Sequence, residues 1–165
     1  MILDLKPLLL GEEAALSIDC SFDFSDAVFS GEKPFKKPVT VRGSLFARAE
    51  VVTVSLNATA VYDGCCDRCG REMEEICPVQ IERVAVVAAQ SEENDDLLVL
   101  PDMQLDLEEL VFSELVLSLP MKHLCREDCL GVCPTCGANL NDGACGCKQD
   151  TVDPRLAALQ ELLNE

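Results

Sequence analysis

Apolar and polar residues alternate with a period of two through the first 62 residues. This period places apolar side chains on one face of an extended strand and polar side chains on the other. Together with β-branched runs, it predicts strands at residues 16–24, 39–47, 52–62, 79–87 and 97–100, the last of them at a sheet edge. Residues 29–38 hold glycine, prolines and three lysines, which indicates a loop. We therefore expect the first three strands to be consecutive and antiparallel, each half buried.

The pattern changes to helical spacing after the last strand. Asp106 is a suitable N-cap for a helix that begins at Leu107, and Pro120 ends that helix. An Asp-Pro pair at 153–154 predicts the start of a second, amphipathic helix. The predicted fold class is α+β, with an antiparallel β-rich core, one central and one C-terminal helix, and a C-terminal cysteine-rich zinc-binding segment.

Cysteine is the unusual residue of this chain, with 11 cysteines among 165 residues. No segment has the apolar length of a membrane span or the basic start of a secretory signal, so we expect a cytoplasmic protein whose thiols stay reduced. The stretch from Cys125 to Cys147 has too few apolar residues for a core of its own. We expect residues 1–124 to form a β-rich domain and residues 125–165 to pack with it as one unit.

Two segments have the form of a zinc knuckle, CxxCG, at residues 66–70 and 133–137. In this turn two thiolates can converge on one ion, and the glycine permits a positive φ. Each knuckle supplies half of a tetrahedral site. The second knuckle can be completed locally, which gives a site of Cys133, Cys136, Cys145 and Cys147. The first has no second pair nearby, and its best partners are distant, which gives a site of Cys66, Cys69, Cys125 and Cys129.

Other interpretations of the cysteines stay open at this point. One site can draw its ligands from Cys125, Cys129, Cys133 and Cys136, or a CxxC pair can simply pack as small apolar side chains. We favour two zinc ions over one, which leaves Cys20, Cys65 and Cys77 without metal. His123 lies close to Cys125, but a lone histidine between a helix and a loop is more often solvated than a ligand.

The candidate sites predict a structural rather than a catalytic metal. A catalytic zinc keeps an open coordination position, whereas four thiolates close the site. The chain has one histidine, no nucleophile motif around it and no glycine-rich phosphate loop. We therefore expect no enzymatic activity and no small-molecule substrate.

Three stretches together resemble a known family: LSLPMKHLCREDCLGVCPTCGANLNDGACGC at residues 117–147, DPRLAALQELL at 153–163 and CDRCG at 66–70. They are similar to the YceD family, the large ribosomal RNA subunit accumulation proteins. The resemblance implies a role in accumulation of 23S ribosomal RNA and in assembly of the large ribosomal subunit.

The charge of the chain bears on how such a role is carried out. There are 13 basic and 30 acidic residues, a formal net charge of −17, and no third of the chain is net positive. Such a surface repels phosphate. We therefore expect protein contacts with a basic ribosomal protein or assembly factor, with RNA touched indirectly or by a local patch at Lys33, Lys36 and Lys37.

Two alternative functions remain open from the sequence. The first is direct RNA binding by the knuckle loops, with Arg68, Arg71 and Arg126 as contacts. The second is a redox-sensitive zinc switch in which Cys65 or Cys77 attacks on oxidation.

Overall fold

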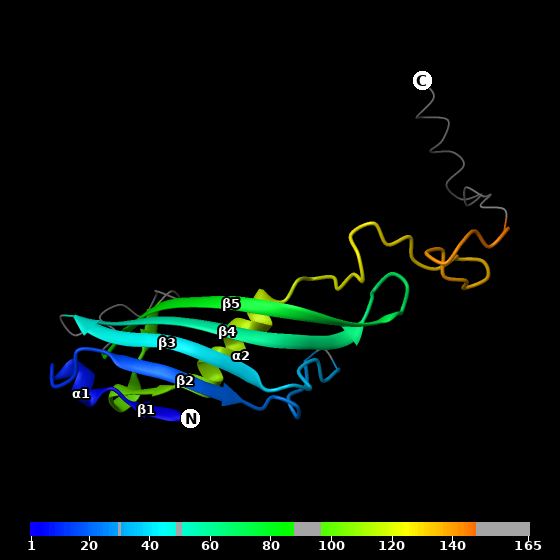
Figure 1. The fold of residues 1–165 in the computed structure, drawn as a ribbon. Coiled ribbons are helices and arrows are strands. Elements are labelled where there is room, and N and C mark those ends of the chain that lie inside the picture. The colour runs from blue at the N-terminus through cyan, green and yellow to red at the C-terminus, as the bar shows by residue number, and fades with distance from the viewer. Residues whose placement is uncertain (30, 49–50, 88–96, 148–165) are drawn as a thin grey trace, which may run out of the picture.

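The computed structural model describes residues 1–29, 31–48, 51–87 and 97–147. Within these residues the main element is a five-stranded sheet of order β2-β3-β4-β5-β6 (Figure 1). Strands β2 to β5 are each antiparallel to the next, whereas β6 is parallel to β5. Their bounds are β2 Leu16–Phe22, β3 Val39–Arg48, β4 Val51–Cys65, β5 Glu72–Val86 and β6 Leu97–Val99. The predicted α+β class is confirmed.

One face of the sheet is buried, as the period of two predicts. In β4 the alternate residues Val52, Val54 and Leu56 are fully buried, while Asn57 and Thr59 on the other face are exposed. Helix α2, Leu107–Ser118, crosses the buried face (Figure 1). It packs its own buried side chains against the sheet: Leu107, Leu110, Val111 and Leu115.

The central helix begins where its predicted cap lies. The Asp106 carboxylate accepts hydrogen bonds from the backbone N–H groups of Glu108 and Glu109, at 3.1 and 3.4 Å. These bonds satisfy donors that have no partner within the helix. An ion pair of 2.6 Å between Arg83 on β5 and Glu114 on α2 adds a polar contact to the packed face. The C-terminal helix predicted from residue 153 lies outside the described residues.

The β4–β5 hairpin is longer than the sequence pattern predicts. The two strands pair residue for residue from Val51 with Val86 to Cys65 with Glu72, so β5 begins seven residues before the predicted start at Val79. The pattern misses this end because neither face of β5 is strongly buried there: Glu72 and Glu74 on one face are exposed, and Met73 and Glu75 on the other are only half-buried. At about 3.3 Å per residue the hairpin is about 50 Å long. It therefore carries the first knuckle well away from the core.

Several short elements have no sequence signal. Strands β1, Ile2–Asp4, and β7, Gln104–Asp106, form a two-stranded sheet, and helix α1, Lys6–Leu9, follows β1. A 3-10 turn, Pro101–Met103, precedes β7. Three or four residues are too few to display a period. No helix in the described part of the chain combines the length and apolar character needed to cross a bilayer.

Gly43 in the middle of β3 allows a close approach between strands. A Cβ atom at this position would lie 2.2 Å from the backbone oxygen of Ser55 and 2.8 Å from the Cα of Leu56. We predict that Gly43→Ala lowers the free energy of unfolding by about 1–3 kcal/mol because β4 must move away. Urea denaturation measures the loss, and Ser44→Ala on the neighbouring position is the control. An unchanged midpoint for Gly43→Ala would contradict the prediction.

Candidate metal centres

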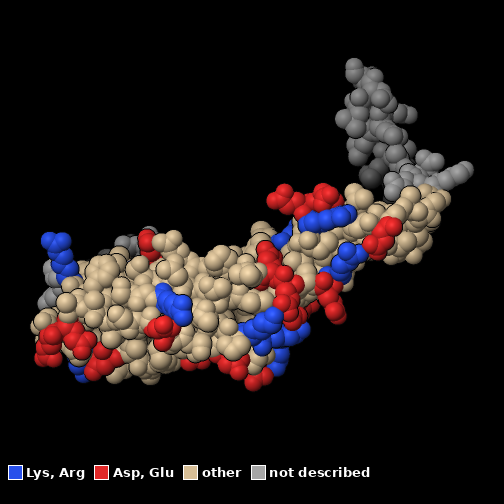
Figure 2. All heavy atoms as spheres, in the orientation of Figure 1, with Lys and Arg blue, Asp and Glu red and all other residues tan. Residues whose placement is uncertain are grey.

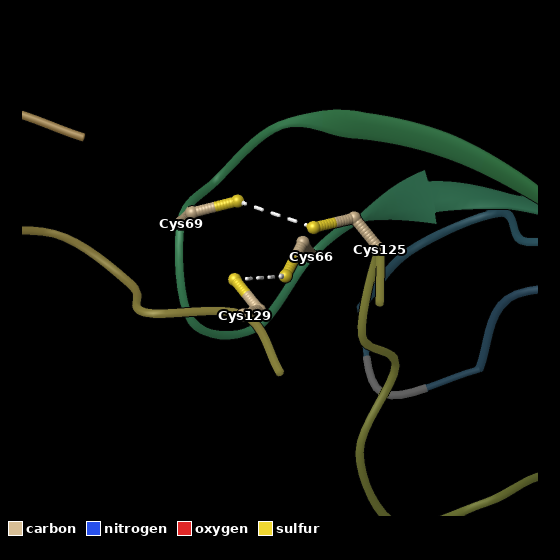
Figure 3. Close-up of side chains that lie close together, drawn as sticks. All are labelled: Cys66, Cys69, Cys125 and Cys129. Atoms are coloured by element: carbon tan, nitrogen blue, oxygen red, sulfur yellow. Dashed lines mark hydrogen bonds between the residues drawn. The ribbon is translucent and has the colours of Figure 1, made fainter. Parts of the chain in front are cut away.

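Four thiols from two distant parts of the chain meet at the tip of the β4–β5 hairpin (Figure 3). Cys66 and Cys69 lie in the turn between the strands, while Cys125 and Cys129 lie in the segment after α2. The Sγ atoms of Cys66 and Cys129 are 3.8 Å apart, and those of Cys69 and Cys125 are 3.7 Å apart. All four Sγ atoms lie within 4.8 Å of one another. We call this group the hairpin tetrad.

The sulfur positions of the hairpin tetrad match a tetrahedral zinc site. Four ligands at about 2.3 Å from a central Zn²⁺ lie about 3.8 Å from each other. The two measured separations agree with this edge length. Cys66, Cys69 and Cys129 are buried, at 2%, 9% and 3% exposure, and Cys125 is half-buried. The tetrad can therefore hold one metal ion, closed off from substrate.

A second group of four thiols forms within one short segment. The Sγ atoms of Cys133, Cys136, Cys145 and Cys147 also lie within 4.8 Å of one another. Cys133 is buried and Cys136 is exposed, with the other two between these extremes. We call this group the local tetrad. The alternative of one site made of Cys125, Cys129, Cys133 and Cys136 does not match the structure. The first two of these cysteines belong to the hairpin tetrad and the last two to the local tetrad.

The two knuckles have the same backbone geometry. In each, the N–H of the first cysteine donates to the carbonyl five residues later, and the glycine N–H donates to the carbonyl of the first cysteine. All four bonds are 2.8 Å long: Cys66 to Arg71, Gly70 to Cys66, Cys133 to Ala138, and Gly137 to Cys133. Both glycines have positive φ, +69° for Gly70 and +74° for Gly137. This turn is the local structure that the CxxCG pattern predicts.

The thiols of one tetrad differ in how readily they lose a proton. The backbone N–H of Cys125 points to the Cys66 sulfur and lowers the pKa of that thiol to about 6. Burial raises the pKa of Cys125 to about 12. In the local tetrad, the N–H groups of Cys136 and Thr135 lower the pKa of Cys133 to about 6. Clustered thiolates repel one another, so a divalent cation is required to hold four of them deprotonated.

His123 joins the post-helix segment to the hairpin. Its backbone N–H donates to the Asp67 carboxylate at 2.7 Å, and the Asp67 N–H donates to the His123 carbonyl at 2.9 Å. The imidazole is stacked on Tyr62, with ring centroids 3.6 Å apart, and its Nδ1 lies 3.3 Å from a Glu75 oxygen. The expectation of a solvated histidine is wrong, because His123 is 8% exposed. It fixes the segment that carries Cys125 and does not join the tetrad.

The arginines proposed as RNA contacts make contacts within the protein. Arg68 donates to the carbonyl of Cys129 at 2.9 Å, and Arg71 forms an ion pair with Asp142 at 2.7 Å. Arg126 pairs with Asp128 at 3.2 Å. Arg68 and Arg71 therefore link the first knuckle to the segment after α2, and Arg71 alone reaches the loop of the local tetrad.

The predicted lysine patch is also paired with acidic side chains. Lys33 contacts Asp26 at 2.8 Å, and Lys36 and Lys37 contact Asp63 and Glu74. Of the described cysteines, the remaining three belong to neither tetrad. Cys65 is exposed beside the first knuckle, while Cys20 and Cys77 are half-buried, and burial raises the pKa of both.

The chain is similar to several curated bacterial proteins over fewer than half of its residues. An uncharacterized protein of Mycobacterium tuberculosis (strain H37Rv) is 36% identical over 74 residues, which is 45% of this chain and 35% of that protein. The uncharacterized protein YlbN of Bacillus subtilis (strain 168) is 35% identical over 74 residues, 44% of this chain and 43% of that protein. The match thus spans less than half the length of either relative. No solved structure matches the chain significantly.

A family comparison covers a larger part of the chain. Residues 54–163 match the sequence model described as "Large ribosomal RNA subunit accumulation protein YceD". The matched range includes both knuckles and all eight cysteines of the two tetrads. The description names an accumulation factor rather than an enzyme. The match also agrees with the resemblance seen in the sequence. The chain belongs to the YceD family.

Proposed function

We propose that this protein is a non-enzymatic, zinc-stabilised accessory factor for assembly of the large ribosomal subunit and accumulation of 23S ribosomal RNA. In this proposal it acts in the cytoplasm, mainly through protein contacts. The family relationship supports the ribosomal role. The single observation that carries the zinc assignment is the convergence of eight thiols into two compact tetrads.

Two zinc ions bind in this proposal, one in each tetrad. Cys66, Cys69, Cys125 and Cys129 hold the first, and Cys133, Cys136, Cys145 and Cys147 hold the second. All-thiolate sets favour a soft or borderline ion such as Zn²⁺ over Mg²⁺ or Ca²⁺. Each closed site cross-links the polypeptide and leaves no coordination position for a substrate. The metal is therefore structural in this role.

The same metal connection bears on domain organisation. The hairpin tetrad takes two thiols from the β-rich part, residues 1–124, and two from residues 125–165. We propose that these parts fold as one unit, joined by the first zinc ion. The contacts of His123 with Tyr62, Asp67 and Glu75 support this arrangement because they hold the chain immediately before Cys125.

The charge distribution favours a basic protein as the partner. The chain has a net charge of −17, and Figure 2 shows acidic side chains spread over the displayed face with the basic ones among them. Arg68, Arg71 and Arg126 are engaged within the molecule, which reduces what they can offer to phosphate. Opposite charge accelerates encounter with a basic ribosomal protein or assembly factor and orients it.

Metal content tests the number of sites. We predict two equivalents of zinc per chain in protein purified without chelator, measured by inductively coupled plasma mass spectrometry. Cys66→Ser and Cys133→Ser each lose one equivalent because each removes a ligand from a different tetrad. Cys20→Ser, outside both tetrads, is the control and keeps two. One equivalent in the parent chain, or the same residual site in both variants, would contradict the assignment.

Chelation tests what the metal holds together. Structural zinc contributes on the order of 10–16 kcal/mol of apparent binding free energy. We predict that removal of zinc exposes residues 119–147 to hydrogen exchange, while the amides of β2 to β4 stay protected by the apolar core. Mass spectrometry of peptides measures both regions in one experiment. Re-addition of zinc restores protection, and protection of 119–147 that survives chelation would refute the structural role.

Binding measurements test the kind of partner. We predict that the zinc-loaded chain binds at least one purified basic protein of the large subunit, with an affinity that falls at least 10-fold between about 50 and 300 mM salt as charges are screened. Fluorescence anisotropy measures this binding, and fragments of 23S ribosomal RNA are tested in parallel. Tight RNA binding that is lost when Arg68, Arg71 and Arg126 are replaced would instead support the direct RNA-binding alternative.

A further inference from the structure

Asn141 lies in the loop of the local tetrad, but its side chain contacts the hairpin tetrad. It lies in the loop between Cys136 and Cys145, and its side chain is partly buried. Its amide nitrogen Nδ2 is 3.3 Å from the sulfur of Cys129, which is a ligand candidate of the other group. Among the contacts of the described residues, this one joins the loop of one tetrad directly to a sulfur atom of the other.

The orientation of the Asn141 amide is fixed by its other partners. The oxygen Oδ1 accepts from the Leu130 N–H at 2.9 Å and from Nη2 of Arg126 at 2.7 Å. Both partners are donors only, so the oxygen must face them. The NH₂ group is then directed at the Cys129 sulfur and at Oδ1 of Asn139, 2.8 Å away. Asn141 therefore donates an N–H to sulfur.

The loop that carries Asn141 is held against the first knuckle by polar contacts. Asp142 pairs with Arg71 at 2.7 Å, and the Leu140 N–H donates to the Gly131 carbonyl at 2.9 Å. Gly131 itself lies close to Arg68, so that a Cβ there would be 3.1 Å from the Arg68 oxygen. The buried apolar cluster around the hairpin tetrad includes no residue of this loop. Its order thus depends on the local tetrad and on these polar contacts.

We propose that Asn141 is a positioning residue that couples the two metal centres. When zinc closes the local tetrad, the loop is ordered and Asn141 presents its N–H to the Cys129 sulfur of the hairpin tetrad. The inference rests on the proposed zinc binding. Hydrogen bonds from outside the ligand set typically change metal affinity by about 10–100-fold. Because coupling free energies are reciprocal, each filled site then raises the affinity of the other by the same factor.

A double-mutant cycle tests the coupling. Zinc is titrated out with a competing chelator, and the amide resonances of Gly70 and Gly137 report occupancy of the hairpin and local tetrads separately. We expect Cys133→Ser, which disables the local tetrad, to weaken zinc binding at the hairpin tetrad by about 10–100-fold. Asn141→Ala has a similar effect in the parent chain and no further effect in the Cys133→Ser background.

Asn141→Asp tests the N–H donor separately from the docking of the loop, because it removes the donor and keeps the acceptor oxygen. The carboxylate keeps the acceptor contacts with Leu130 and Arg126 but places an oxygen opposite the thiolate, so we expect a loss at least as large as for Asn141→Ala. In the cobalt-loaded protein, the sulfur-to-metal absorption band shifts in both variants. Asn57→Ala, at an exposed position of β4, is the matched control and changes neither readout.

Four outcomes would overturn the proposal. Asn141→Ala can weaken the hairpin tetrad equally in the parent and Cys133→Ser backgrounds, which would make its role purely local. Asn141→Asp can bind zinc like the parent chain, which would remove the N–H as the cause. Zinc at both tetrads with no effect of any Asn141 variant would refute the coupling alone. A parent chain that binds no zinc would refute the proposed function as well.

Discussion

The meeting of four sulfur atoms at the hairpin tip is the constraint on which the attachment of the segment after α2 to the hairpin depends. It joins residues 63 positions apart, Cys66 with Cys129, and 56 apart, Cys69 with Cys125. The buried cluster there consists of cysteines, with Met73 and Leu124 partly buried against it. Apolar burial at this end is therefore small, and small cores need another source of stability. The same thiols serve as packing and as candidate ligands.

Whether a feature could be predicted from the sequence depends on how far apart its interacting residues lie along the chain. The knuckles could be identified because a CxxCG turn makes its own hydrogen bonds within six residues, and the alternation revealed the strands because one face is covered along most of their length. The end of the hairpin that carries the first knuckle could not be identified, since neither face of β5 is strongly buried there. His123 and Asn141 carry no local signal either. Their roles depend on Tyr62, Asp67 and Cys129, which are 12 to 61 residues away.

The net charge and the internal pairing of the arginines both bear on the kind of partner that we propose for this protein. Its basic residues near the knuckles are bound to carbonyls and carboxylates of the protein itself, as for Arg68 and Arg71. An approaching polyphosphate would have to displace those partners and overcome a net charge of −17. A basic protein would not have to displace internal partners, since exposed carboxylates such as those of Glu72 and Glu127 already face solvent. The balance of these effects is the reason that we propose a protein rather than RNA as the partner.

The two tetrads also differ in the length of chain that must be ordered to bring their thiols together. The local tetrad spans 15 residues, Cys133 to Cys147, so its thiols meet through a short loop. The hairpin tetrad closes a chain segment of about 60 residues, and each doubling of loop length adds about 0.6 kcal/mol of closure entropy. Folding of the sheet and α2 reduces that entropy, because α2 ends at Ser118, only seven residues before Cys125. The sheet therefore organises the first centre, while the second organises its own polypeptide.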